Sequence, residues 1–68
     1  MELSARNQLT GTIRSVKVGN IMAEVVVDVG GQEIVAAITR GSVEQLGLTE
    51  GQRVVAIIKA TDVMIAKD

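Results

Sequence analysis

The 68-residue sequence contains no cysteine, no histidine, no proline and no aromatic residue. Without cysteine the chain forms no disulfide, and without cysteine or histidine it lacks the ligands that soft metal ions prefer. The same two residue types are common nucleophiles and general bases in enzymes, and the spacing of the acidic residues suggests no catalytic pair of carboxylates. We therefore expect a binding or assembly protein and not an enzyme.

The composition also argues against nucleic acid or lipid as a partner. Domains that bind single-stranded nucleic acid stack the bases on aromatic rings along a basic groove. This chain has no aromatic side chain, and its seven basic and eight acidic residues give a net charge of −1. No apolar run approaches the roughly 20 residues of a membrane span, and the first residues lack the basic and apolar regions of a signal peptide. These absences favour a cytoplasmic protein that binds neither nucleic acid nor membranes.

The apolar segments are too extensive for a self-sufficient monomer of this length. A single domain over residues 1–68 buries only about 60% of the surface of its unfolded chain and is marginally stable alone. Hydrophobic residues make up 47% of the sequence, and residues 25–27 and 54–58 are apolar at every position. Strands formed by these segments present apolar side chains on both faces of a sheet, which so short a chain cannot cover. The sequence predicts an obligate homo-oligomer with apolar interfaces.

Short apolar runs separated by glycine predict a fold made mainly of strands. Along residues 9–18 apolar and polar residues alternate, and the alternation shifts by one position near Arg14-Ser15, which predicts a β-bulge. Gly19-Asn20 supplies the two positive-φ positions of a tight hairpin turn, and Gly30-Gly31 is a second hairpin signal. The predicted strands cover residues 9–18, 21–29, 33–39, 53–59 and 63–66.

One short helix is expected between the third and fourth strands. Ser42 can cap a helix that starts at Val43, and Gln45 fits the reciprocal position of a capping box. Gly47 suits a left-handed stop. Five short strands with a small helix after the third are typical of an all-β, five-stranded Greek-key barrel of the oligonucleotide/oligosaccharide-binding (OB) type. A small barrel of the SH3 type is the alternative, because periodicity does not separate the two.

Two segments carry the groups that hold a tetrahedral oxyanion. Residues 4–8 combine the hydroxyl of Ser4 with the planar guanidinium of Arg6, and their short side chains leave backbone N–H groups accessible. Residues 59–61 repeat the pattern of a cation, a small residue and a hydroxyl. Taken alone, each segment is most simply a polar terminus or a solvated strand end. Adjacent across a subunit boundary, the two segments would surround one dianion with two positive charges and several donors.

Together with Ala23-Glu24-Val25 and the continuation Asp62-Val63-Met64, these segments resemble the molbindins, small cytoplasmic molybdate-binding proteins of bacteria built from a single TOBE-type domain. The resemblance extends from Leu3 to Ala66. It implies an OB-like subunit assembled as a hexamer, a trimer of dimers, with molybdate or tungstate at subunit interfaces and no organic cofactor. One interface site, carried over by motif, takes Ser4, Ala5 and Arg6 from one subunit and Lys59, Ala60 and Thr61 from its neighbour, with Ala5 and Ala60 acting through their backbone.

The resemblance implies a second class of site near the threefold axis, for which Asn20 and Ser42 are candidates. Both lie next to turn or helix-start N–H groups, which attract anions. A hairpin residue and a helix cap are the alternative explanations, and Ser42 can serve as both ligand and cap. Where a relative has serine in place of Ala60, this chain lacks one hydroxyl, so weaker binding is expected there.

The expected function is the binding and storage of molybdate or tungstate without catalysis. An OB-like oligomerisation or regulatory ligand-binding module is the alternative, and a nucleic-acid-binding OB domain is a further one.

Overall fold

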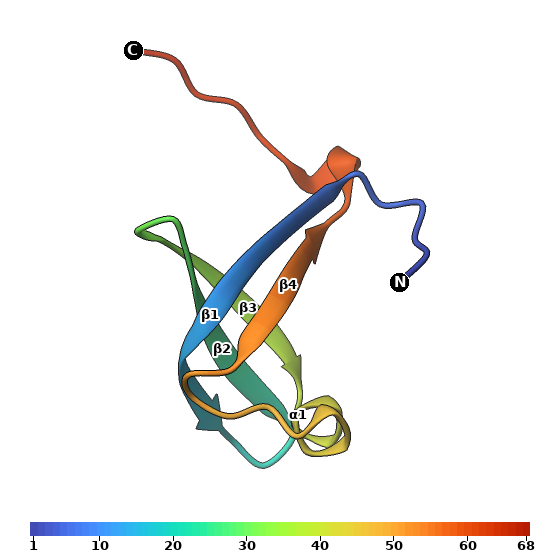
Figure 1. Cartoon of the computed structure of the whole chain (residues 1–68), viewed down its shortest axis with the longest axis vertical. Helices are drawn as coiled ribbons and strands as arrows, with labels where there is room; N and C mark the ends of the chain where they lie inside the picture. The colour runs from blue at the N-terminus through green and yellow to red at the C-terminus, as the bar shows by residue number, and fades with distance from the viewer.

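The computed structural model describes all 68 residues, and its strands form one antiparallel sheet (Figure 1). The sheet has the strand order β3-β2-β1-β4. Neither helix is long and apolar enough to cross a membrane. The elements in chain order are β1 (Asn7–Val18), β2 (Met22–Val29), β3 (Gln32–Thr39), helix α1 (Arg40–Leu46), β4 (Arg53–Ile58) and the 3₁₀ helix η1 (Ala60–Asp62).

The bulge that the sequence predicts lies in β1, opposite β2. Ile13 pairs with Val27 and Ser15 pairs with Val26, so Arg14 is the extra residue. A bulge bends its strand and increases the local twist. Residues 7–12 of β1 pair with β4, and residues 12–18 pair with β2. This bend curves the whole sheet around one apolar face.

Close approach of β1 and β2 explains the glycine in the first half of β1. A Cβ placed on Gly11 would lie 2.8 Å from Val27 Cγ1 and 2.9 Å from Val29 Cγ2, and would also collide with the carbonyl oxygen of Asp28. Real Cβ atoms do not make such contacts, because protein interiors are close-packed without overlap. Only glycine fits here without a shift of one strand.

The β2–β3 connection is the tight turn that its two glycines predict. Gly30 and Gly31 have φ values of 58° and 87°, and they join the paired residues Val29 and Gln32. Both central positions of such a turn need a positive φ, which glycine adopts without strain.

The same prediction is wrong for the β1–β2 connection, where neither Gly19 nor Asn20 has a positive φ. The loop between the last ladder pair, Val18 and Ala23, is longer than two residues. It closes through a hydrogen bond from the Gly19 amide to the Met22 carbonyl at 2.8 Å. A longer loop spreads the reversal over more residues and needs no left-handed position.

Helix α1 begins earlier than the sequence predicts, at Arg40. Its N-cap is Thr39, whose Oγ1 accepts a hydrogen bond from the Ser42 amide at 3.0 Å. Ser42 is therefore inside the first turn and not the cap, and Gln45 is not at a capping-box position. Because Thr39 is the last residue of β3, the chain enters the helix directly from the strand. Gly47 ends the helix with φ 62°, as predicted.

The predicted five-stranded closed barrel is wrong for the single chain, which has a four-stranded open sheet. Residues 63–66, expected as the fifth strand, continue from η1 without pairing and lead away from the sheet (Figure 1). Strands β3 and β4 are consequently both edges. The buried core is small and consists of Ile13, Ala23, Val25, Val27 and Val43.

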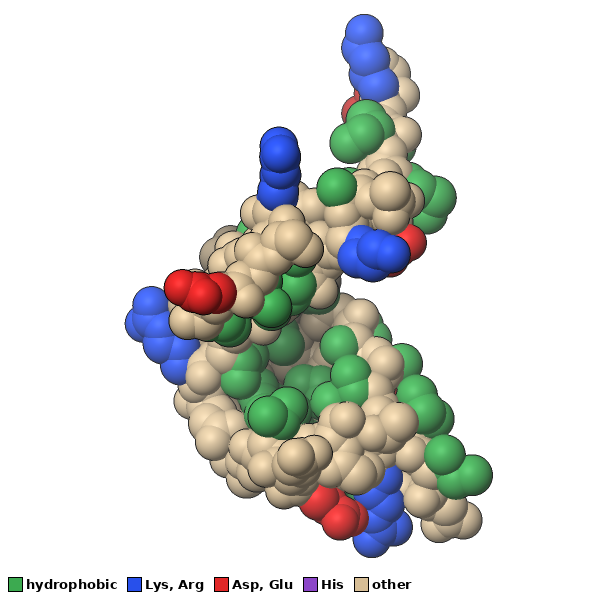
Figure 2. Space-filling view, turned by 90° about the vertical axis from the view of Figure 1, so that its right-hand side faces the viewer, with side chains coloured by type: hydrophobic (Ala, Val, Ile, Leu, Met, Phe, Trp, Pro, Cys, Tyr) green, Lys and Arg blue, Asp and Glu red, His purple; other side chains and the backbone are tan.

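The open sheet encloses an apolar groove of about 950 Å³ on its concave side. Sixteen of its 18 lining residues are hydrophobic, and Figure 2 shows a hollow lined with hydrophobic side chains. Ile13, Val25 and Val27 belong to its lining, together with residues of the two edge strands β3 and β4. The face that a closed barrel would bury is open to water in the single chain.

Candidate functional site

The two segments that the sequence selects for anion binding lie at the same end of the sheet. Strands β1 and β4 are antiparallel, and their ladder ends at the pair Asn7 and Ile58. Residues 4–6 lead directly into Asn7, and residues 59–61 follow directly after Ile58. In Figure 1, η1 lies beside the start of β1. One chain thus brings both halves of the candidate site to one end, and their pairing across subunits stays a prediction.

Two side-chain amides fix the backbone of the N-terminal segment. Gln8 Nε2 donates a hydrogen bond to the carbonyl oxygen of Ala5 at 2.7 Å, and Asn7 Nδ2 donates to the carbonyl oxygen of Ile58 at 3.2 Å. The first bond folds residues 4–8 into a compact loop, and the second joins the loop to the end of β4. The sequence analysis assigned no role to these two side chains. Two consecutive carboxamide residues at the start of a strand are the pattern that could have indicated it.

The C-terminal segment forms a tight turn that leaves backbone donors without internal acceptors. In η1 the amide of Asp62 donates to the carbonyl of Lys59 at 2.9 Å, and that of Val63 donates to the carbonyl of Ala60 at 3.3 Å. The amides of Ala60 and Thr61 precede the first of these bonds, so they have no acceptor within the turn. Two consecutive N–H groups are therefore available at this position.

Both cations of the candidate site lack an acidic partner. The ion pairs of the chain are formed by Arg14 and Arg40, and the side chains of Arg6 and Lys59 are exposed. Neither segment contains a carboxylate, and Asp62, which directly follows the second one, also forms no ion pair. The positive charge at this end of the sheet is consequently available to an external anion.

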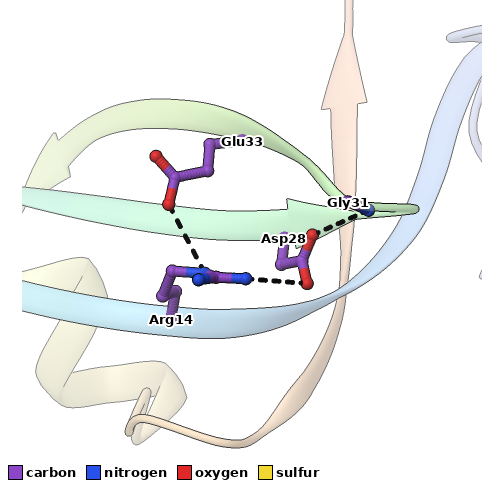
Figure 3. A network of polar contacts seen from close by, with 4 residues as sticks. All are labelled: Arg14, Asp28, Gly31 and Glu33. Atoms are coloured by element: carbon purple, nitrogen blue, oxygen red, sulfur yellow. Dashed lines mark hydrogen bonds and ion pairs between the residues drawn. The ribbon is translucent and has the colours of Figure 1, made fainter.

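Arg14, on the bulge, is by contrast a cation that forms ion pairs within the chain (Figure 3). Its Nη2 donates to Asp28 Oδ2 at 3.0 Å, and its Nε lies 3.4 Å from Glu33 Oε2. The Asp28 carboxylate also accepts a hydrogen bond from the Gly31 amide at 3.0 Å. This network joins β1, β2 and β3 and secures the β2–β3 turn, so its role is structural. No cluster of three or more acidic residues is placed to hold a metal cation.

The candidates for a second site lie at the opposite end of the sheet. Asn20 is in the β1–β2 loop and Ser42 is in the first turn of α1. The Arg40 amide donates to the Ile21 carbonyl at 2.8 Å, which holds the start of α1 against that loop. The Ser42 amide already donates to Thr39 Oγ1, whose hydroxyl donates to Ser42 Oγ at 2.8 Å. Ser42 therefore keeps only its hydroxyl hydrogen for a ligand.

Comparison with known proteins identifies the family of this chain. The model of the TOBE domain family matches residues 3–65. Molybdenum-pterin-binding protein 1 of Clostridium pasteurianum is 52% identical over 66 residues, which are 96% of this chain and 97% of that protein.

Two solved structures share the fold over their whole length. A molybdate-binding protein from Sporomusa ovata matches with a TM-score of 0.94 and 43% identity, covering 98% of this chain and 100% of that one. MopII from Clostridium pasteurianum matches with a TM-score of 0.91 and 46% identity, covering 97% of this chain and 100% of that one. The chain belongs to the molbindins, proteins built from a single TOBE domain.

Proposed function

We propose that the chain binds molybdate or tungstate through the two segments at the end of the β1–β4 ladder. The observation that carries the proposal is the convergence of Arg6 and Lys59, two cations without internal partners, at one end of one strand pair. The similar protein from Sporomusa ovata is a molybdate-binding protein, which supports the choice of ligand. Tungstate has nearly the same size and charge, so the same donors suit it.

The donor set matches the chemistry of such an oxyanion. Molybdate is a dianion whose four oxygens accept hydrogen bonds and donate none at neutral pH. Each charge-assisted hydrogen bond contributes about 1.5–3 kcal/mol net. Five or six of them support micromolar binding or tighter after the cost of association. The proposed ligands each offer a donor and none is a carboxylate: Ser4, Ala5, Arg6, Lys59, Ala60 and Thr61.

The site is proposed to close between subunits of a hexamer, arranged as a trimer of dimers. Among its six residues only Ala5 is even partly buried in the single chain. An anion held by one chain would therefore stay in water, where ion pairs contribute little. A neighbouring subunit that supplies the second half of the donors would also exclude water and strengthen each interaction. We expect residues 4–6 of one subunit to face residues 59–61 of another.

A second oxyanion site is proposed at Asn20 and Ser42, near a threefold axis. The hydrogen bond that holds the start of α1 against the β1–β2 loop places these two residues in neighbouring elements. One chain offers few free donors there, because Thr39 already accepts from the Ser42 amide. The site therefore depends on several copies of the same loop around the axis.

The proposed role is storage of the oxyanion in the cytoplasm, without catalysis and without an organic cofactor. The name of the relative from Clostridium pasteurianum links molybdenum to a pterin. A pterin ring is bound by stacking on aromatic side chains as well as by hydrogen bonds, and this chain has no aromatic residue. Inorganic molybdate is therefore the ligand that its residues suit best.

Thermal unfolding of ligand-free protein with added oxyanions tests this proposal. Sulfate is the matched control, since it has the same charge and shape and is smaller. We expect molybdate and tungstate to raise the melting temperature far more than sulfate at equal concentration, because ligands that bind only the folded state stabilise it. Equal shifts would leave a generic anion site, and no shift would refute the proposal. Native mass spectrometry counts subunits and bound oxyanions in the same samples.

A further inference from the structure

Two consecutive carboxamide side chains each hold a peptide group in one half of the candidate site. Gln8 Nε2 donates a hydrogen bond to the Ala5 carbonyl oxygen at 2.7 Å, three residues back along the chain. Asn7 Nδ2 donates to the Ile58 carbonyl oxygen at 3.2 Å, 51 residues away in the sequence. In both cases the carbonyl belongs to the residue directly before a cation of the site.

The planarity of the peptide group lets these two hydrogen bonds orient backbone donors. In a trans peptide the carbonyl of one residue and the N–H of the next point in opposite directions and rotate as one plane. The chain has no cis peptide bond. A bond to the Ala5 carbonyl therefore fixes the direction of the Arg6 N–H. A bond to the Ile58 carbonyl fixes the direction of the Lys59 N–H in the same way.

Both of these N–H groups are without an acceptor in the chain. Arg6 and Lys59 lie outside the strands and helices, and neither backbone amide donates to another group. The two carbonyl oxygens, whose partial negative charge would repel an anion, each accept from a carboxamide instead. Each half of the site thus holds one backbone donor in a fixed direction before a ligand arrives. Such preorganisation strengthens binding, because less conformational freedom is lost in the complex.

We propose that Gln8 and Asn7 are positioning residues of the interface oxyanion site and set its preference for molybdate over the smaller sulfate. They aim the backbone N–H groups of Arg6 and Lys59 at the oxyanion without contacting it themselves. Donors that supporting hydrogen bonds lock in place fit oxygens at one distance from the central atom, whereas loosened donors follow either anion. This inference rests on the proposed function of residues 4–6 and 59–61.

The two carboxamides differ in how much of this positioning depends on them. Ala5 precedes β1 and has no strand partner, so the exposed bond from Gln8 is the hydrogen bond that holds its carbonyl. Ile58 is the last residue of the β1–β4 ladder, so strand pairing also restrains its peptide group. Loss of the Gln8 amide should therefore loosen the site more than loss of the Asn7 amide.

Nuclear spin relaxation of ¹⁵N in the ligand-free protein tests the positioning step without any anion. In the parent we expect order parameters of about 0.85 for the N–H groups of Arg6 and Lys59, as in rigid backbone. Gln8→Met keeps the length of the side chain and removes the donor. It should lower the order parameter of the Arg6 N–H to below about 0.6 and leave that of Lys59 unchanged. An Arg6 N–H that stays rigid in this variant would overturn the proposal.

Calorimetric titration with molybdate and with sulfate measures the consequence for binding. Ordering one freed backbone residue weakens binding about 5- to 30-fold, and we expect this loss for molybdate in Gln8→Met, against roughly threefold or less for sulfate. Asn7→Leu should change the ratio of the two affinities in the same direction by a smaller factor. Gln52→Met is the matched control, because Gln52 Nε2 makes the same kind of bond, to the Gly47 carbonyl at 3.3 Å, before the other end of β4. It should change neither dissociation constant by more than about twofold.

The ratio of the two affinities separates positioning from a structural role of Gln8. A structural role would lower the melting temperature of the ligand-free protein and leave the ratio at the parent value, which would overturn the proposal. We expect a reduced ratio in an oligomer of unchanged size. A parent that binds neither oxyanion refutes the proposed function. A parent that prefers molybdate, with a Gln8→Met variant that keeps the same preference, refutes only this inference.

Discussion

Replacement of Arg6 by alanine isolates the contribution of one cation to anion binding. Arg6 is exposed and forms no ion pair within the chain, so its removal leaves the contacts of the fold intact. The loss of one charge-assisted hydrogen bond costs about 1.5–3 kcal/mol. At about 1.4 kcal/mol for each factor of ten, we expect Arg6→Ala to bind molybdate about 10- to 150-fold more weakly.

Isothermal titration of the parent and the variant with molybdate measures this change. Arg53→Ala is the control, because Arg53 is also an exposed cation without an ion pair and lies at the other end of β4. We expect it to alter the dissociation constant less than twofold. A dissociation constant for Arg6→Ala within twofold of the parent, in an oligomer of unchanged size, would refute the assignment of the site. Higher salt should narrow the difference, since the interaction is electrostatic.

Three further substitutions test other parts of the structure. Asp62→Asn removes the carboxylate that directly follows residues 59–61, so we expect severalfold tighter molybdate binding, most clearly at low salt; unchanged titrations would show that this charge does not reach the anion. Gly11→Ala forces a Cβ to within 2.8 Å of Val27 Cγ1, and such overpacking costs about 1–3 kcal/mol. At about 4–8 °C per kcal/mol, thermal melting monitored by circular dichroism should detect it, and an unchanged melting temperature would contradict the close approach. Thr39→Ala removes the cap of α1 and is expected to cost about 0.5–2 kcal/mol in urea unfolding, with Thr39→Ser largely restoring it.

The features that could be predicted from the sequence are those with local signals. The alternation of apolar and polar residues shifts by one position at Arg14-Ser15, and the bulge lies there. Gly30-Gly31 forms its turn because the residues on either side pair directly. Gly19-Asn20 has a similar turn sequence, but the last β1–β2 pair is Val18 and Ala23, so the loop is longer than two residues. A loop of that length needs no residue with a positive φ. Local patterns identify turns, and strand pairing decides their type.

The parts that could not be predicted depend on contacts between distant segments. Thr39 and Ser42 are both good caps, and the end of β3 at Thr39 decides between them. Residues 63–66 have the composition of a strand, but a strand needs a neighbour, and this segment pairs with no strand of its own chain. The two halves of the candidate site are recognisable by composition, whereas their meeting at one end follows from the antiparallel pairing of β1 with β4.

The short length of η1 has a consequence for how long a bound anion would be retained. Only four residues, Lys59 and the three of η1, separate β4 from residues 63–66, so an anion held between this turn and a neighbouring subunit must leave before the two subunits separate. In the proposed assembly, loss of the ligand and separation of the subunits become a single slow event. Loaded particles would then persist on dilution while empty ones exchange subunits. The residence time of the cargo would be set by the lifetime of the assembly and not by the affinity of an isolated site.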